Sequence, residues 1–574
     1  MTDTNIRSMF KRCGLYMMSG FHQIFTCANR ERFGLIGKFA TGGQHINLKA
    51  VVGALLFSVA TFLAFTLPDH PDAFGYAALA RLPLEWPLMA LAALMLRGWL
   101  RRFAILLSGA IVFLVLFLKM ADLGVQSAFQ RPFNPYLDIK MLSDGWNLIS
   151  RSFGTPAAVA ALAGGTILIL LVAVVFLKSL RWMAQARGRP RQLLLGAFAA
   201  ILAIGVSALL LGRPQVEFAT PTYLSARLGL IARSVADMQV FEKQLADGIG
   251  PKDGKNLFQA VKGKDVVLIF VESYGRSAVE DPQYAGVTSP RLAAVEQQIE
   301  AAGLHAASGW VTSPTVGGLS WLAHGTLLSG LWVDSQGRYD RLMISHQLSL
   351  NRLFSQAGWH SVAVMPAITL EWPEAEYFGY DQTLAAKDLE YRGKPFNWVT
   401  MPDQYTLSAF DRLAVKAARA RGQNVMAEIA LISSHAPWTP VPKLIDWNLV
   451  GDGQAFNEQA TSGDPPSVVW ADPVRVRSQY IQTIDYSLAT LGDFMARQGR
   501  GTIYIILGDH QPASIITGPN ASRAVPVHIV TDDVQLLTRF QNDGFSPSMA
   551  PTNATRELPM NELRQLLIDG LSSR

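Results

Sequence analysis

Four separate stretches of this chain carry side chains that together suit the activation of a hydroxyl nucleophile. They contain an acid, a serine, a histidine and an adjacent acid–histidine pair, namely Glu272, Ser320, His435, Asp509 and His510. Carboxylates, imidazole and a hydroxyl are oxygen and nitrogen ligands that suit zinc or manganese. A divalent ion lowers the pKa of a bound hydroxyl and offsets charge on a phosphoryl or sulfuryl centre. Because His435 has no neighbouring carboxylate, we expect it to face the substrate rather than the metal.

Each of these residues also has a plainer interpretation. Ser320 follows a glycine pair and opens an apolar segment of helical character, where a developing negative charge is favoured, but serine is also a common helix cap. Glu272 could cap a helix or pair with Arg276. His435 could be a hydrogen-bonded loop residue, and Gly508-Asp509-His510 could be a turn. The positions of these residues in the predicted fold favour the chemical interpretation.

The candidate residues follow the ends of predicted strands. Glu272 comes directly after the apolar run 266–271, His435 follows Met426–Ile432, and Asp509 follows Thr502–Leu507 and a glycine. Open α/β sheets build their sites at the carboxyl ends of strands. Further strands are predicted near 306–312, Ser361–Met365 and Val525–Val530, and helices near 289–302, Gln404–Arg421 and Val474–Arg497. This alternation predicts a largely parallel sheet covered by helices on both sides.

The first part of the chain has the composition of a membrane protein. The 574 residues are 50% hydrophobic and only 16% charged, with a mean hydropathy of +0.20. Apolar runs of about 20 residues, long enough to cross a bilayer, predict about five spans. They lie near 48–67, 80–97, 103–122, 155–177 and 192–212. Glu85 and Pro87 interrupt the second run.

Basic residues give the orientation. They cluster before the first span, between the second and third, and between the fourth and fifth, for example Lys49, Arg101, Arg102, Lys178 and Arg191. All three clusters fall on one side of the membrane, which the positive-inside rule identifies as the cytoplasm. The clusters also account for the net charge of +6, and no basic and aromatic stripe indicates nucleic-acid binding. We therefore expect everything after about residue 213 to be extracytoplasmic.

The predicted organisation has five parts. A cytoplasmic N-terminal segment (1–47) precedes a transmembrane module (48–212) and a linker with an amphipathic helix (213–264). A catalytic domain (265–535) and a C-terminal tail (536–574) follow. The outside connection 123–154 is compatible with an interfacial segment and with a plain loop anchored by aromatic residues. The only cysteines, Cys13 and Cys27, precede the first span, so the catalytic domain contains neither a disulfide nor a cysteine metal site.

The ordered motifs resemble those of the sulfatase-like branch of the alkaline phosphatase superfamily. They are Val271-Glu272-Ser273, the Ser320 segment, Ser434-His435-Ala436-Pro437 and Gly508-Asp509-His510. With the membrane module, the layout resembles the membrane phosphotransferases: lipoteichoic acid synthases, phosphoglycerol transferases and phosphoethanolamine transferases. The resemblance implies an alkaline-phosphatase-like α/β domain on the outer face of a bacterial inner membrane. It also implies that Glu272, Asp509, His510 and Ser320 hold the metal, that Ser320 is the nucleophile, and that His435 contacts the substrate or leaving group.

Departures from the family patterns refine this expectation. Ser320 lacks the following x-Pro-x-Arg of true sulfatases, so we expect an unmodified serine. Ser273 stands where calcium sulfatases have a second acid, which favours one divalent ion, Mn²⁺ or Zn²⁺. The segment 368–374 supplies Trp372 but not the arginine of lipoteichoic acid synthases. His324, Trp372 and Trp438 are the candidates for substrate binding, with packing as the alternative.

Three functions follow from this pattern. The first is a transferase that moves a phospholipid head-group phosphate, of phosphoglycerol or phosphoethanolamine type, to an envelope glycan or lipid through a covalent Ser320 intermediate. The second is a hydrolase of phosphate or sulfate esters with the same metal centre. The third is a non-catalytic membrane scaffold, which the complete set of ligands disfavours.

Overall fold

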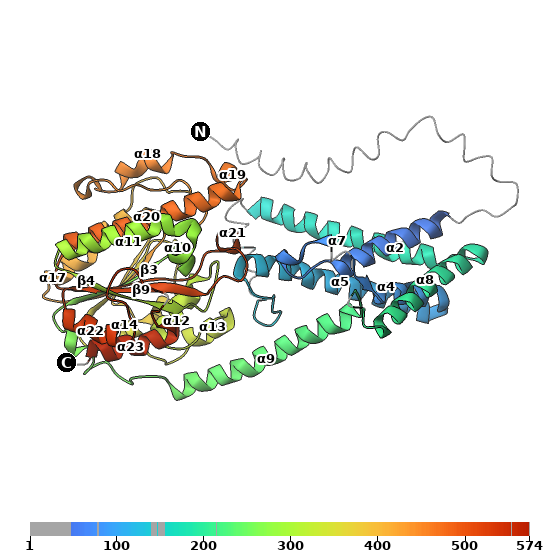
Figure 1. Cartoon of the computed structure of the whole chain (residues 1–574), viewed down its shortest axis with the longest axis horizontal. Coiled ribbons are helices and arrows are strands. Elements are labelled where there is room, and N and C mark those ends of the chain that lie inside the picture. The colour runs from blue at the N-terminus through green and yellow to red at the C-terminus, as the bar shows by residue number, and fades with distance from the viewer. Residues whose placement is uncertain are drawn as a thin grey trace. The chain divides into compact units, whose positions relative to one another are not determined.

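The computed structural model describes residues 48–572, apart from 77–79, 139–145, 147–154, 214 and 553. The described residues form two compact units (Figure 1). Of the described residues, one unit contains those from 48 to 64, Leu82–Phe113 and Leu168–Glu217. The other contains those within Phe65–Arg81, Leu114–Ile167 and 218–572. The predicted N-terminal segment 1–47 lies outside the described residues.

Four helices are long and apolar enough to cross a membrane: α2 (Leu48–Thr66), α5 (Gly98–Phe129), α7 (Thr155–Ala184) and α8 (Gly188–Leu210). The remaining predicted span, near 80–97, contains a shorter helix, α4 (Glu85–Met95). At 1.5 Å per residue its 11 residues rise only about 16 Å, against about 30 Å for the hydrocarbon core. The chain before α4 forms β1 (Leu82–Pro83), which pairs with β2 (Val216–Glu217).

Contacts inside the first unit show how α4 runs. Its start lies near the end of α8, because Leu82 is paired with Val216. Its end lies near the start of α8, because the Arg191 guanidinium donates to the Leu94 carbonyl at 3.1 Å. The short helix and β1 therefore run antiparallel to α8 over much of its length. The basic connections also meet, since Arg101 donates to the Ala184 carbonyl at 3.2 Å. This agrees with the predicted gathering of basic residues at one end of the helices.

The predicted amphipathic helix is part of α9 (Ala219–Asp247), which ends at Gly248 with a φ of +71°. In the connection 123–154, the first residues continue α5 to Phe129 and turns follow to Asp138. Most of the rest of this connection lies outside the described residues, so both interpretations of it stay open.

The second unit contains an eight-stranded sheet in the order β10-β4-β9-β8-β3-β7-β5-β6. Every neighbouring pair is parallel except those made by β9. The strands are β3 (Asp265–Val271), β4 (His305–Thr312), β5 (His360–Met365), β6 (Gln382–Ala385), β7 (Val425–Leu431), β8 (Thr502–Gly508), β9 (Ala524–Thr531) and β10 (Glu557–Pro559). The expected largely parallel α/β sheet is confirmed.

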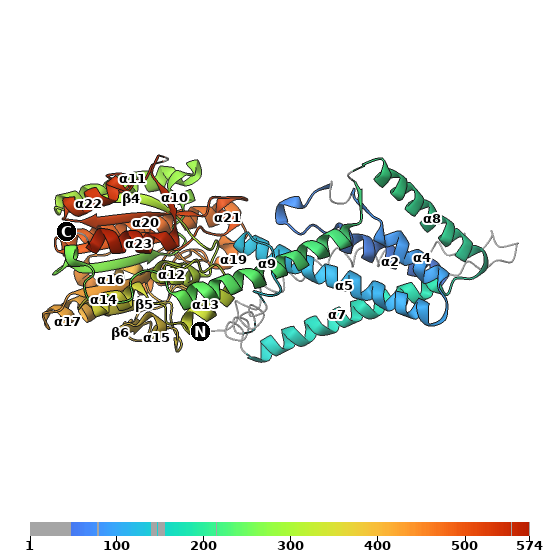
Figure 2. The ribbon, with the colours of Figure 1, turned by 90° about the horizontal axis from the view of Figure 1, so that it is seen from below.

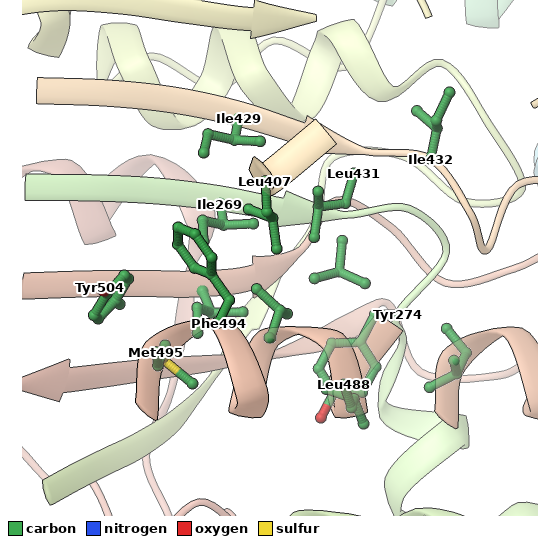
Figure 3. Packing of buried hydrophobic residues seen from close by; sticks show 14 of the residues in the cluster. Ile269, Tyr274, Leu407, Ile429, Leu431, Ile432, Leu488, Phe494, Met495 and Tyr504 are labelled. Carbon is green, nitrogen blue, oxygen red and sulfur yellow. The ribbon is translucent and has the colours of Figure 1, made fainter. Parts of the chain in front are cut away.

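Alternate residues of β3 pack on opposite faces of the sheet, as the pleat of a strand requires. Val267, Ile269 and Val271 join the cluster beneath α11 (Pro282–Ala301) and α20 (Pro473–Gln498). Figure 3 shows the ring of Phe494, from α20, reaching toward Ile269 of β3. The intervening residues pack with α12 (Ser320–Ser329), α14 (Leu350–Gln356), α22 (Val534–Asn542) and α23 (Met560–Ser572). Figure 1 shows these two sets of helices on opposite faces of the sheet, and Figure 2 is the view from the side of α12, α14, α22 and α23.

The segment 536–574, which the sequence set apart as a tail, contributes to this core. Its strand β10 pairs in parallel with β4, and Leu558 lies opposite Val311. Leu563 and Leu567 of α23 are fully buried. Burying one leucine side chain stabilises a fold by about 1.5–3 kcal/mol, so α23 is a structural part of the second unit.

Candidate active site

The candidate residues meet at the carboxyl ends of three adjacent strands. β3 lies between β8 and β7 and runs parallel to both. Glu272 directly follows β3, and Asp509 and His510 directly follow β8. Ser320 reaches the same edge as the first residue of α12. The position matches the expectation for an open parallel sheet.

The turn before α12 fixes the direction of Ser320. Leu319 has a φ of +64°, an uncommon conformation for a residue with a side chain, and Gly317 has a φ of +74°. A Cβ atom at Gly317 would lie 1.9 Å from the carbonyl oxygen of Ala128, so only glycine fits there. Ser273, next to Glu272, also has a positive φ of 57°. Such strained positions are typical of functional sites.

The Ser320 hydroxyl does not cap its helix. Its Oγ donates to Glu272 Oε2 at 3.1 Å and lies 3.3 Å from His510 Nε2. His510 Nε2 lies 3.3 Å from Glu272 Oε1 and 3.6 Å from Asp509 Oδ2. One ligand atom from each of Glu272, Asp509 and His510 lies within 4.8 Å of the others. The structure therefore brings together the four residues that the sequence predicts as metal ligands.

The histidine presents the nitrogen that a metal would need. His510 Nδ1 lies 2.8 Å from the Gln511 carbonyl, which can only accept, so Nδ1 carries the hydrogen. Nε2 then faces the two carboxylates with its lone pair when the ring is neutral. A backbone carbonyl that orients the ring in this way is a common feature of metal-binding histidines.

The pKa shifts show that the site holds more negative charge than its neighbours balance. Burial and the nearby charge of Glu272 raise the pKa of Asp509 to about 6. Burial works to lower the pKa of His510, but the carboxylates of Asp509 and Glu272 outweigh it and raise that pKa to about 9. Burial likewise works to raise the pKa of Glu272, but the His510 charge leaves it well below its ordinary value. Two buried acids sharing one imidazole fit a divalent cation.

Hydrogen bonds hold the two acids rigidly. Asp509 Oδ1 accepts from the backbone N–H groups of Ser273 at 2.8 Å and His510 at 2.7 Å. The Ser434 hydroxyl donates to the Glu272 carbonyl at 2.6 Å, and the Ser313 hydroxyl donates to the Asp509 carbonyl at 2.6 Å. The remaining carboxylate oxygens are therefore directed toward Ser320 and His510 by fixed backbone.

A cavity of about 300 Å³ opens beside these residues. Ser320, Glu272 and Asp509 line its polar side, and His435 lines it as well. His435 is exposed, and its Nδ1 lies 2.5 Å from the Ala436 carbonyl. Among the described residues, the group that could hold a metal contains Glu272, Asp509 and His510. Much of the remaining wall is apolar, including Phe270, Met365, Ile368 and Phe378.

The three candidates for substrate binding are placed differently. Trp372 and His324 line the cavity. Trp438 is buried, donates from its indole N–H to the Ser434 carbonyl at 2.7 Å, and stacks on Trp470. Its position favours the packing alternative, in which Trp438 supports the loop that carries His435.

Glu272 and Arg276 have separate partners. Its carboxylate accepts from the Ser273 hydroxyl at 2.9 Å and from Ser320, and it contacts His510. Arg276 binds Glu280 at 2.6 Å and Glu557 at 3.0 Å. Glu272 is therefore directed into the candidate site.

Two buried acids near the site were not singled out from the sequence. Asp403 accepts from the backbone N–H groups of Ile432 at 3.0 Å and Ser433 at 2.9 Å, just before His435. Glu428 lies in the middle of β7 and lines the cavity. A single acid inside an apolar strand was the signal for Glu428. Asp403 at the start of a helix had no such signal, because aspartate is common there.

Comparisons with known proteins agree in kind with the resemblance. No protein-family model and no curated protein matches the chain. The structure is similar to the lipooligosaccharide phosphoethanolamine transferase EptA from Neisseria meningitidis, with 15% identity, coverage of 92% of this chain and 95% of that one, and a TM-score of 0.39. It is also similar to the lipoteichoic acid synthase LtaP from Listeria monocytogenes, with 14% identity, coverage of 50% and 70%, and a TM-score of 0.34.

A third similar structure is the phosphoglycerol transferase GacH from Streptococcus pyogenes, with 12% identity, coverage of 59% of this chain and 90% of that one, and a TM-score of 0.32. By their names, these three structures are a phosphoethanolamine transferase, a lipoteichoic acid synthase and a phosphoglycerol transferase. The similarities are remote and assign no residue a role, so the function of this chain has to be inferred from its own site.

Proposed function

We propose that this protein is a membrane-anchored, metal-dependent transferase that moves a phospholipid head-group phosphate to a hydroxyl of an envelope glycan or lipid. The observation that carries this proposal is the position of Ser320. Its hydroxyl lies within 3.3 Å of Glu272 and His510, at the start of a helix and on the wall of a cavity. A nucleophile in this position can form a covalent intermediate and divide one displacement into two.

Glu272, Asp509, His510 and Ser320 would hold one divalent ion, Mn²⁺ or Zn²⁺. When bound, the ion lowers the pKa of the serine hydroxyl and offsets charge on the phosphoryl group. The chain itself aligns Ser320 for attack, and the N-terminus of α12 favours negative charge on the attached phosphoryl group. His435 lines the opening of the cavity, where it would contact the substrate or leaving group.

The cavity wall supports transfer over hydrolysis. Most residues that line it are apolar or aromatic, including Phe270, Trp372 and Phe378. An apolar wall excludes loosely bound water from a reactive intermediate. It also suits a donor or acceptor with apolar parts.

The arrangement of the membrane helices supports an extracytoplasmic site. Arg101 lies in the first turn of α5 and Arg191 in the first turn of α8, and both lie at the same end of the first unit. With that end in the cytoplasm, the chain leaves α8 on the outer side. We therefore place the catalytic unit, residues from about 265 onward, outside a bacterial cytoplasmic membrane.

The test is the intact mass of the purified, metal-loaded protein after incubation with a mixed phospholipid extract, beside the Ser320→Ala variant. A mass added to the wild type alone supports the proposal and identifies the transferred group. If the wild type gains no mass but releases phosphate or sulfate from model esters, the hydrolase is the better assignment. If the wild type binds no metal ion at micromolar concentration, a non-catalytic membrane scaffold is the better assignment.

A further inference from the structure

The cavity has a second polar feature that the metal centre does not use. Glu428, in the middle of β7, is 1% exposed. Its Oε1 lies 2.7 Å from His324 Nδ1, and its Oε2 accepts from the Tyr380 hydroxyl at 2.5 Å and from Asn351 Nδ2 at 3.0 Å. None of these three partners is a lysine or arginine. A carboxylate buried in this way is costly, so its retention calls for a function.

His324 connects this carboxylate to the reaction space. It follows Ser320 by one helical turn on α12, which places the two side chains on the same face of the helix. Its ring stacks on Phe270, with 3.8 Å between ring centroids, and its side chain is 12% exposed. The ring therefore has a fixed position on the wall of the cavity that Ser320 also lines.

The contact with Glu428 shows which ring nitrogen of His324 carries a hydrogen. An ionised carboxylate only accepts hydrogen bonds, so His324 Nδ1 is the donor. Nε2 is then the ring nitrogen available to a molecule in the cavity. Of the histidines that line the cavity in the described chain, His324 has a carboxylate behind it, whereas the Nδ1 of His435 contacts the Ala436 carbonyl. A carboxylate bonded to one ring nitrogen fixes the orientation of the imidazole and the nitrogen that it presents.

We propose that His324 is the acid–base residue of the transfer reaction and that Glu428 positions it; this rests on the proposed function. In the first half, Ser320 has released its proton to solvent and its Oγ forms a bond to phosphorus. The bond from phosphorus to the departing oxygen breaks, and that oxygen takes the proton of His324 Nε2. In the second half, the acceptor hydroxyl gives its proton to Nε2 and bonds to phosphorus. The bond to Ser320 Oγ breaks, and Ser320 regains a proton from solvent.

The test compares two donors that differ only in the oxygen that departs. Phosphatidylethanolamine or phosphatidylglycerol in detergent releases an alcohol that needs a proton, whereas the p-nitrophenyl ester of the same head group releases a stable anion. The variant is His324→Gln, whose amide can still donate to Glu428 but cannot transfer a proton. We expect the variant to slow adduct formation from the lipid by roughly 100-fold or more. With the p-nitrophenyl ester we expect a loss of less than about tenfold, because no proton is required.

Two further variants make the result specific. Glu428→Gln should slow adduct formation from the lipid more than from the p-nitrophenyl ester, but by a smaller factor than His324→Gln. His435→Gln, the matched histidine change, should slow adduct formation from both donors by the same factor. An equal loss on both donors in His324→Gln, or no loss, overturns the inference. A thermal-unfolding midpoint within a few degrees of the wild type shows that the variants are folded.

The two proposals fail in different ways. If wild-type protein forms an adduct that Ser320→Ala does not, but His324→Gln behaves as the wild type, the transferase assignment stands and the role of His324 is wrong. If the wild type forms no adduct with either donor, the transferase assignment is wrong and the role of His324 falls with it.

Discussion

The Ser320 hydroxyl donates to Glu272 at 3.1 Å across 48 positions of sequence. This contact joins the start of α12 to the end of β3. The first prediction concerns the loss of the Ser320 hydroxyl. Replacing Ser320 with alanine removes the proposed nucleophile but keeps Glu272, Asp509 and His510. We expect the rate of head-group transfer to fall about 10⁴-fold or more, as for other catalytic serines. We expect metal content, measured by mass spectrometry of the purified protein, to remain close to one ion per chain.

The threonine variant is the matched control. Ser320→Thr keeps a hydroxyl at the same place and should retain measurable transfer. If Ser320→Ala loses its metal as well as its activity, the hydroxyl is mainly a ligand and the nucleophile has to be sought elsewhere.

A second prediction concerns the balance of charge in the metal centre. The pKa of Asp509 is raised because burial and Glu272 both disfavour its charged form. A bound divalent ion should relieve this repulsion and stabilise the fold by about 2.7 kcal/mol when its concentration is 100 times its dissociation constant. Removing the ion with a chelator should therefore lower the thermal-unfolding midpoint, and Mn²⁺ or Zn²⁺ should restore it.

Asp509→Asn separates this effect from a general loss of stability. The variant removes one of two competing acids, so its metal-free unfolding midpoint should stay near that of the wild type or exceed it. Its midpoint should no longer respond to the ion. A full metal response in Asp509→Asn would remove Asp509 from the ligand set.

Much of the fold could be predicted because the buried strands are short apolar runs. The strands Val425–Leu431, Thr502–Gly508 and Ala524–Thr531 lie within one residue of their predicted bounds. The three-residue β10 was missed, because so short a strand has no detectable pattern. Its segment was assigned to a tail, although tertiary contacts build it into the sheet. The length of α4 was also overestimated, since apolar composition does not distinguish a helix from the extended β1 that precedes it.

The candidate site was predictable to the extent that it depends on strand ends. Glu272, Asp509 and His510 directly follow strands, so their meeting point follows from a parallel sheet. Glu428 was not predictable in the same way, because it lies inside a strand and its partners His324 and Tyr380 come from different elements. The direction of an inward-facing side chain depends on the register of the strand, and the partner on the opposing helix is set only by the completed packing.

A third prediction concerns the loop that carries His435. Asp403 Oδ1 accepts from the backbone of Ile432 and Ser433, and its Oδ2 accepts from the Ser487 hydroxyl at 2.6 Å. Asp403→Asn keeps the size of the side chain but removes its negative charge. It also replaces one carboxylate oxygen with an N–H donor group, which can then face the Ser487 hydroxyl. We expect a loss of about 1–3 kcal/mol in the free energy of unfolding. The transfer rate should fall further than this instability explains, because the loop loses its anchor.

The two effects can be measured separately. Chemical denaturation gives the stability, and the transfer rate is then compared at a temperature where both proteins are fully folded. Asp452→Asn, which alters an exposed acid bonded to Gln454, is the control. A rate equal to the wild type in folded Asp403→Asn would show that the loop position does not depend on this carboxylate.

The last prediction concerns pH and His528, a histidine outside the group of candidate metal ligands. His528 is fully buried in β9, with Nδ1 2.8 Å from the Ser308 hydroxyl and Nε2 3.2 Å from the Tyr274 hydroxyl. Burial lowers its pKa from 6.5 to about 3. Between pH 3 and pH 6.5 the His528 ring is therefore neutral in the folded protein, whereas the same ring binds a proton in the unfolded chain. Below pH 6.5, protonation of this histidine stabilises the unfolded state by about 1.4 kcal/mol for each pH unit. The free energy of unfolding therefore falls as the pH falls.

The measurement is the free energy of unfolding of the full chain in detergent between pH 4 and pH 7, compared among three proteins. His528→Gln should lose the contribution of one proton to the slope in this window, because glutamine does not titrate. His305→Gln, which removes an exposed histidine from β4, should keep the wild-type slope. Above pH 6.5 the free energies of unfolding of the wild type and His528→Gln should differ by a constant amount. The His528 ring is then neutral in both the folded and the unfolded wild type. A slope in His528→Gln equal to that of the wild type would mean that the folded protein binds the proton at His528 as readily as the unfolded chain does.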